Sequence, residues 1–199
     1  MINLALFSSG NGSIVENIHK YIDSRKLNTN RKDSMIIKMV FINNKNAYVI
    51  KRCIGLRIPY FVFNEDDMKN GKIFNKLKKE KIDFISLCGY LKLIPKQIVD
   101  YYKKRIINIH PSLLPKYGGK GMYGMNVHMK VIDNNEKYSG ISIHYVNGGY
   151  DDGDIIIRIR QRISMSDTPE SLANKIHFLE YKWYPVTIYS LCNNLDELY

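Results

Sequence analysis

Short apolar runs rich in β-branched residues alternate, in the first half of the chain, with segments whose apolar positions follow a helical period. Such runs predict strands, and the segments between them predict helices. The expected strands cover residues 3–7, 35–42, 60–63, 84–88 and 105–109, and the expected helices cover residues 14–24, 47–55, 73–80 and 95–103. This alternation indicates an α/β fold, with a mostly parallel central sheet and helices on its faces.

The pattern changes after Gly121. A helix is expected over residues 124–132, and two alternating segments, 140–146 and 154–163, predict antiparallel strands near the C-terminus. A closing helix is expected near Thr168, because Thr168 can cap a helix and Pro169 suits its first position. We see no repeat, linker or low-complexity tract, so we expect a single domain over residues 1–199.

Composition narrows the class of protein. The chain has 199 residues, 45% of them hydrophobic, which is enough to bury one sizeable core. No stretch approaches 18 apolar residues, and the apolar N-terminal run lacks a basic region or a cleavage site, so we expect a cytoplasmic protein. The three cysteines, Cys53, Cys88 and Cys192, lack the spacing of a disulfide framework or a zinc site, and we interpret them as small core residues.

The formal net charge is +11. Such a charge would ordinarily suggest a nucleic-acid or membrane partner. However, the positive residues are mostly lysines spread along the chain, whereas a nucleic-acid surface should concentrate arginines among aromatic residues. We therefore expect neither nucleic acid nor membrane as a partner, although a small anionic substrate would benefit from the same field.

A glycine-rich loop, Ser9–Ser13, lies directly between the first expected strand and the first expected helix. Backbone N–H groups and the helix dipole favour an anion at such a position. The loop matches neither the dinucleotide fingerprint nor the P-loop, so it indicates phosphate binding only weakly.

A sharper motif, Asn108–Pro115, follows at the end of the fifth expected strand, where open α/β sheets bind their ligands. Asn108 and His110 are two residues apart, so on a strand their side chains project from the same face. Pro111 and Pro115 stiffen the exit from the strand.

A third motif runs from the expected strand 140–146, which contains His144, into an acidic, glycine-rich loop with Asp151, Asp152 and Asp154. Three carboxylates can form a cation site, but their spacing does not match a calcium-binding loop, and we expect no metal.

Together the three motifs resemble the glycinamide ribonucleotide formyltransferase family nearly from end to end. The resemblance implies a Rossmann-like formyltransferase fold, with a nucleotide and phosphate half over about residues 1–107 and a catalytic, folate-completing half over about residues 108–199. It also implies an activity in purine synthesis, with transfer of the formyl group of 10-formyltetrahydrofolate to the amine of glycinamide ribonucleotide. The expected partners are these two small molecules, and the expected assembly is a monomer or a homodimer.

By motif position, the resemblance implies that Asn108, His110 and Asp151 form the catalytic set. Asn108 and protonated His110 would stabilise the oxyanion that forms when the amine attacks the formyl carbon. His110 would also transfer the proton, because its intrinsic pKa lies near neutrality. A nearby carboxylate favours the imidazolium, so Asp151 is expected to raise the pKa of His110 and to orient its ring.

The resemblance further implies binding residues. The ribonucleotide set is Asn11, Gly12, Ser13, Ile14 and Glu180, with Glu180 pairing with the substrate ammonium. The folate set is Leu91, Lys92, Leu93, Ile94, Asn108 and Val146, with Leu87 and Val99 in the same apolar wall. Ile14 departs from the Asn often found there, so any phosphate contact must come from its backbone N–H. Lys69 is only a candidate for contacting the folate tail. Lys120 and His128 have no assigned role. The glycine content of segment 118–124 suggests a mobile lid.

Other readings stay open. Methionyl-tRNA formyltransferases share the catalytic trio but carry an additional C-terminal domain that this chain is too short to hold. Formyltetrahydrofolate hydrolases normally begin with a regulatory domain, whereas the first expected strand here starts at Asn3. A non-catalytic nucleotide- or RNA-binding module could use the glycine-rich loop and the positive charge, and salt-dependent RNA binding without formyl transfer would support it.

Overall fold

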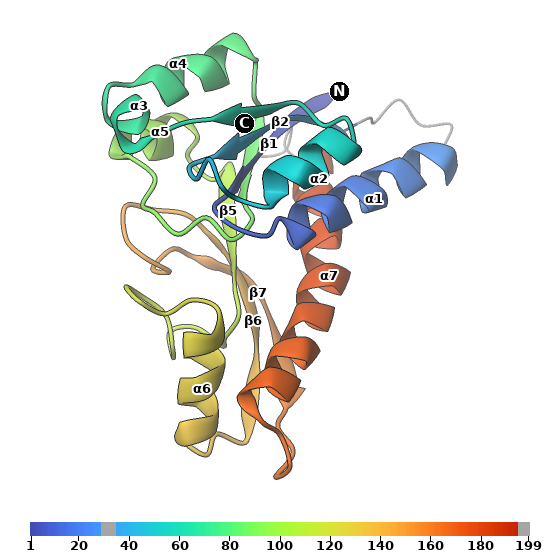
Figure 1. Cartoon of the computed structure of the whole chain (residues 1–199), viewed down its shortest axis with the longest axis vertical. Coiled ribbons are helices and arrows are strands. Elements are labelled where there is room, and N and C mark those ends of the chain that lie inside the picture. The colour runs from blue at the N-terminus through green and yellow to red at the C-terminus, as the bar shows by residue number, and fades with distance from the viewer. Residues whose placement is uncertain (29–34, 195–199) are drawn as a thin grey trace.

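A seven-stranded sheet runs through the computed structural model, which describes residues 1–28 and 35–194 (Figure 1). Its strand order is β3-β2-β1-β4-β5-β6-β7. The strands are β1 (Ile2–Ser8), β2 (Met35–Ile42), β3 (Tyr60–Val62), β4 (Phe84–Leu87), β5 (Ile106–His110), β6 (Tyr138–Tyr145) and β7 (Ile155–Arg162). The helices are α1 (Ser13–Asn28), α2 (Val49–Gly55), α3 (Glu65–Lys69), α4 (Lys72–Lys79), α5 (Lys96–Tyr101), α6 (Met125–Asp133) and α7 (Pro169–Asn193).

Strands β1 to β5 are parallel to their neighbours, and β6 and β7 add antiparallel pairs at one edge. The predicted mostly parallel sheet with antiparallel C-terminal strands is therefore confirmed. The chain moves outward from β1 to β2 and β3, then returns to place β4 on the other side of β1. A reversal of this kind opens a crevice at the carboxyl ends of the strands, which is where α/β sheets bind ligands.

Two groups of buried apolar side chains hold the helices on the sheet. The first group takes side chains from α1, α2, α6 and α7, including Val15, Cys53, Val127 and Ile176. The second takes side chains from α3, α4 and α5, including Leu77. Burying a side chain of this size contributes about 1.5–3 kcal/mol relative to leaving it in water, so each helix is fixed by a few such contacts.

Helix boundaries differ from the sequence-based expectation where capping, not periodicity, decides them. Helix α3 was not predicted, because five residues are too few for a helical period, yet Asn64 and Asp67 form a reciprocal capping box at its start. The predicted start of α7 is confirmed, with Thr168 accepting a hydrogen bond from the Ser171 backbone N–H. Strand β5 runs one residue further than expected and ends on His110.

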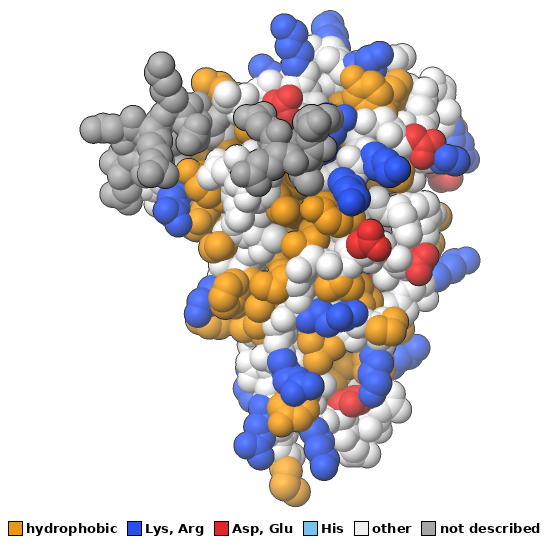
Figure 2. Space-filling model, turned by 180° about the vertical axis from the view of Figure 1, so that it is seen from behind, with side chains coloured by type: hydrophobic (Ala, Val, Ile, Leu, Met, Phe, Trp, Pro, Cys, Tyr) orange, Lys and Arg blue, Asp and Glu red, His pale blue; other side chains and the backbone are white. Residues whose placement is uncertain are grey.

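All three cysteines are free and buried, as expected for core residues. Burial raises the pKa of the Cys53 thiol to about 11. Lys and Arg side chains are scattered over the face shown in Figure 2, and apolar side chains gather across its middle. Within residues 1–28 and 35–194, no helix has the length and apolar character needed to span a bilayer.

Candidate active site

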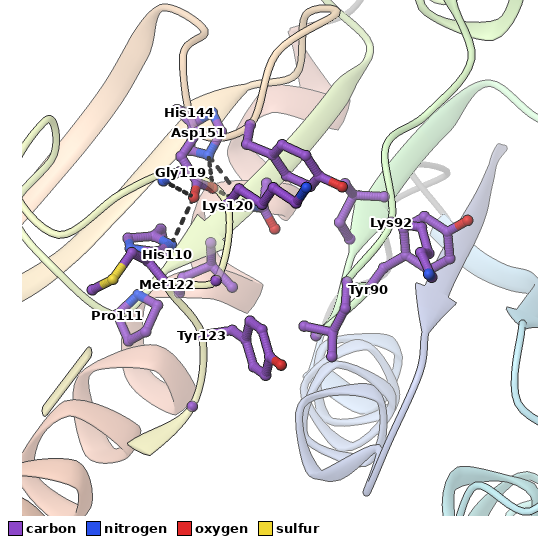
Figure 3. A pocket seen from close by; sticks show the side chains of 18 of the residues that line it. Tyr90, Lys92, His110, Pro111, Gly119, Lys120, Met122, Tyr123, His144 and Asp151 are labelled. Atoms are coloured by element: carbon purple, nitrogen blue, oxygen red, sulfur yellow. Dashed lines mark hydrogen bonds and ion pairs between the residues drawn. The ribbon is translucent and has the colours of Figure 1, made fainter. Parts of the chain in front are cut away.

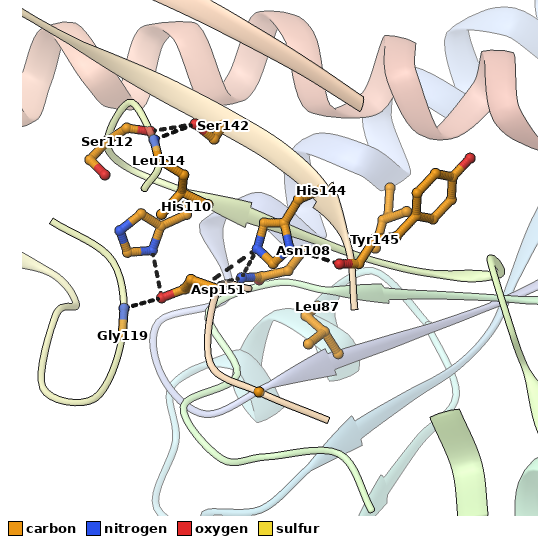
Figure 4. Close-up of polar contacts among 12 residues, drawn as sticks. Leu87, Asn108, His110, Ser112, Leu114, Gly119, Ser142, His144, Tyr145 and Asp151 are labelled. Atoms are coloured by element: carbon orange, nitrogen blue, oxygen red, sulfur yellow. Dashed lines mark hydrogen bonds and ion pairs between the residues drawn. The ribbon is translucent and has the colours of Figure 1, made fainter. Parts of the chain in front are cut away.

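Asn108, His110 and Asp151 meet at the end of β5 (Figure 4). The Asn108 Nδ2 atom donates to Asp151 Oδ1 at 3.2 Å, and His110 Nδ1 lies 3.3 Å from Asp151 Oδ2. His110 is only 3% exposed. The prediction that Asn108 and His110 face the same side of one strand is confirmed, and the β6–β7 loop brings Asp151 to both.

The Asp151 carboxylate has two further contacts. The Gly119 backbone N–H donates to Oδ2 at 3.0 Å, and His144 Nε2 lies 3.5 Å from Oδ1. Burial tends to raise the pKa of Asp151, but the neighbouring His144 and His110 rings and the Gly119 N–H lower it more, so the pKa of this carboxyl stays below its usual value. Asp151 therefore brings a negative charge to the site at neutral pH.

His144 belongs to the site although the sequence motifs assign it no role. On the sheet it lies directly opposite Asn108, because β6 pairs antiparallel with β5. Its Nδ1–H donates to the Tyr145 carbonyl oxygen at 2.8 Å, which leaves Nε2 to accept from Asn108 Nδ2 at 3.2 Å. His144 thus orients the Asn108 amide. This contact depends on the register between β5 and β6, which local sequence patterns do not predict.

The His110 ring lies between two acceptors, the Asp151 carboxylate and the Tyr117 carbonyl oxygen, the latter 2.7 Å from Nε2. Burial is the largest influence on its pKa and lowers it, while Asp151 and Tyr117 raise it. The prediction that Asp151 raises the pKa of His110 is confirmed, but the expectation of a protonated His110 is wrong, because desolvation of the ring outweighs the carboxylate. The ring is therefore mainly uncharged at neutral pH, although both of its neighbours stabilise the protonated form.

Two features, the hydrogen bonds of one serine side chain and the backbone shape at Asp151, hold the loops around the site. Ser142 on β6 donates to the Ser112 carbonyl at 2.7 Å and accepts from the Leu114 N–H at 2.9 Å, which ties the segment after His110 to the sheet. Asp151 itself has a φ of 52°, in the left-handed region that non-glycine residues seldom adopt. The β6–β7 loop can take this shape because Gly153 packs directly on the Tyr145 carbonyl, where a Cβ atom would not fit.

A cavity of about 700 Å³ opens beside the three side chains (Figure 3). His110, His144 and Asp151 line one part of it, and the loop after β4 lines another, including Tyr90 and Lys92. A volume of this order holds a small organic ligand. Among the residues that the structure describes, no cluster of three or more His, Cys, Asp or Glu side chains is arranged to hold a metal ion.

Comparison with known proteins identifies the family. The model of the Formyl transferase family matches residues 2–188. This chain belongs to the formyl transferase family. It is 36% identical over 195 residues to the chloroplastic phosphoribosylglycinamide formyltransferase of Arabidopsis thaliana, a match that covers 95% of this chain and 65% of the relative. It is 35% identical to the Bacillus subtilis phosphoribosylglycinamide formyltransferase over 204 residues, covering 99% of both chains.

Solved structures of formyl transferases show the same fold. The phosphoribosylglycinamide formyltransferase of Bacillus halodurans superposes with a TM-score of 0.83 at 31% identity, covering 99% of this chain and 98% of that one. The Streptococcus pneumoniae enzyme of the same name gives a TM-score of 0.82 at 27% identity and covers 96% and 99%. The predicted Rossmann-like formyltransferase fold is therefore confirmed. The chain nevertheless spans only about two thirds of the Arabidopsis relative and 60% of the Vigna unguiculata one.

Most residues predicted for the folate side of the formyl transferase site line the cavity. These are Leu87, Leu91, Lys92, Leu93, Ile94, Asn108 and Val146. Val99 does not line it, which corrects the sequence-based prediction. It lies on α5 and packs, partly buried, against the second core group instead. Lys69 also lies outside the cavity wall and pairs with Glu65 at 3.0 Å.

The predicted phosphate loop lies at the start of α1. Gly12 has a φ of +77°, and a Cβ there would overlap Val49, so only glycine fits. The Asn11 side chain accepts from Arg52 at 2.8 Å. Of the residues predicted for this contact, only Ile14 lines the cavity, and phosphate binding by Asn11, Gly12 and Ser13 stays a prediction.

On the helical side of the cavity lie Glu180 and His177 from α7, His128 from α6, and Lys120 from the glycine-rich segment. Glu180 is only 5% exposed, so it is not an ordinary surface residue. His128 is buried too, and burial lowers its pKa to about 4. The sequence singled out Glu180, Lys120 and His128 but gave no reason to connect any of them with His177.

Proposed function

We propose that this member of the formyl transferase family transfers the formyl group of 10-formyltetrahydrofolate to the amine of glycinamide ribonucleotide. The observation that carries the proposal is the junction of Asn108, His110 and Asp151 beside a cavity of suitable size. The names of the relatives that match along the whole chain support this choice of substrates.

In the proposed reaction the substrate amine attacks the formyl carbon and forms a C–N bond, while the carbonyl oxygen becomes an oxyanion. The Asn108 amide donates a hydrogen bond to that oxygen, in place of one of its two contacts with Asp151 and His144. An uncharged His110, directly or through a water molecule, accepts the proton that the nitrogen loses. Asp151 stabilises the imidazolium that results, and the proton then passes to the departing folate nitrogen as its bond to carbon breaks.

We place the two substrates in the cavity so that they meet at His110. Its apolar wall beyond β4, with Leu87 and Leu91 to Ile94, suits the flat heterocycle of the folate. Glu180 on the helical side is a buried carboxylate within the cavity wall, and we assign it to the amine end of the ribonucleotide. The phosphate would then lie toward the start of α1, where backbone N–H groups and the helix dipole favour an anion.

A competition assay tests this proposal. The purified protein is incubated with 10-formyltetrahydrofolate and three acceptors in turn: glycinamide ribonucleotide, methionyl-tRNA and water alone. We expect formyl transfer to the ribonucleotide only. Transfer to the tRNA, or hydrolysis at the same rate with and without acceptor, would contradict the proposed substrate.

A further inference from the structure

Glu180 is a buried carboxylate with one close partner. Its Oε2 atom accepts a hydrogen bond from His177 Nδ1 at 2.7 Å, one helical turn earlier on α7. Among the described residues no other side chain is recorded in an ion pair or hydrogen bond with it. A buried carboxylate with so few donors is costly unless something further binds it. Both side chains line the cavity, so a ligand can reach the pair.

His177 connects this carboxylate to solvent. Its side chain is 54% exposed, and its ring stacks on Tyr181 with centroids 6.3 Å apart. The hydrogen bond with Glu180 is the largest influence on its pKa and raises it, whereas partial burial lowers it by less. His177 therefore carries a proton to higher pH than an ordinary histidine does.

The other titratable groups around the pair come from α6, β5 and α7 itself. His128 on α6 stays uncharged near neutrality, because burial and the charges of His177 and His110 lower its pKa to about 4. His110 on β5 is also mainly uncharged, since burial lowers its pKa. Of these three histidines, His177 is thus the one whose charge counters Glu180.

We propose that His177 is a positioning residue that holds the Glu180 carboxylate in place for the amine end of the ribonucleotide. This inference rests on the proposed function. A charged donor forms a hydrogen bond roughly twice as strong as a neutral one, so the protonated ring fixes the carboxylate most firmly. One carboxylate oxygen remains directed by His177 while the other receives the substrate, which needs no change in the helix. Binding of the ribonucleotide therefore weakens as His177 loses its proton.

Two variants separate this role from a purely structural one. His177→Ala removes the donor, and we expect the KM for glycinamide ribonucleotide to rise about tenfold, as for the loss of one charged hydrogen bond, with the KM for the formylfolate unchanged. His177→Asn retains an N–H near the position of Nδ1 but cannot titrate. We expect it to restore most of the affinity at neutral pH and to abolish the rise of KM with pH that the wild type shows above the His177 pKa. Phe178→Ala, an exposed position on the same helix, serves as the control.

An NMR titration adds a measurement that does not depend on turnover. In the otherwise intact protein, Glu180→Gln should shift the His177 ionisation to lower pH, because it removes the charge that raises it. The proposal is overturned if that ionisation does not move, if the ribonucleotide KM of His177→Ala stays within twofold of the wild type, or if both substrates lose affinity equally. Absence of transfer by the wild type would instead refute the proposed function, and the NMR result would still decide whether His177 and Glu180 form a pair.

Discussion

Asp151 connects the groups of the site at the scale of single residues. Its two carboxylate oxygens lie within 3.5 Å of polar atoms of Asn108, His110, Gly119 and His144. The left-handed backbone at Asp151 is what directs the carboxylate inward. Neighbouring Asp152 is exposed and contacts Asn147 instead, so two adjacent aspartates have different environments.

The first prediction concerns the charge of Asp151. That carboxylate raises the pKa of His110 against the opposing effect of burial. Asp151→Asn should therefore lower this pKa further and move the acid limb of the kcat/KM profile to lower pH. The rate at neutral pH should also fall, on the order of 10²-fold or more, because the imidazolium formed in the reaction loses its counter-charge. Asp152→Asn is the matched control, and coincident pH profiles for the Asp151 variant and the wild type would count against the role of Asp151.

At the scale of elements, strand β6 supports the segment that follows His110. Ser142 on β6 makes two hydrogen bonds to that segment, whereas Ser139 on the same strand is also buried but its hydroxyl has no hydrogen-bond partner among the described residues. Ser142→Ala leaves the buried Leu114 N–H without a partner and should lower the free energy of unfolding by about 1–3 kcal/mol. It should also lower kcat, since the segment that leads from His110 to Tyr117 is less firmly held.

Ser139→Ala is the matched control for that variant. Removing a buried hydroxyl that lacks a partner should leave both stability and kcat nearly unchanged. Chemical denaturation and steady-state assays measure both quantities. Equal effects of the two substitutions would show that the hydrogen bonds of Ser142 do not support the site.

The elements that the sequence could predict were those with a strong period or a clear cap. The parallel strands, α7 with its Thr168 cap, and the shared face of Asn108 and His110 all follow from local patterns. The role of His144 could not be predicted, because it depends on the register between β5 and β6. The net pKa shift of His110 depends on how deeply the folded chain buries the ring, and a local pattern does not report burial.

At the scale of the whole molecule, the chain carries a formal net charge of +11, and two lysines, Lys92 and Lys120, line the cavity. The positive field of such a protein raises the association rate of anionic substrates, and salt screens this effect. We expect kcat/KM to fall severalfold between about 0.05 and 0.5 M ionic strength, with kcat little changed. Lys92→Gln should flatten this dependence, whereas Lys69→Gln, outside the cavity wall, should not. A kcat/KM independent of salt would contradict an electrostatic role.

The expected two halves of the chain, the monomer or homodimer state and the cytoplasmic location stay predictions.

We propose that His110 and Asp151 act as one catalytic unit. A double-mutant cycle on the single-turnover rate of formyl transfer tests it most directly, using His110→Ala, Asp151→Asn and the combination. Residues that act together are strongly non-additive. We predict that each single substitution lowers the rate by orders of magnitude, and that Asp151→Asn has little further effect once His110 is gone. If the two effects instead multiply in the double variant, His110 and Asp151 act independently and do not form one catalytic unit.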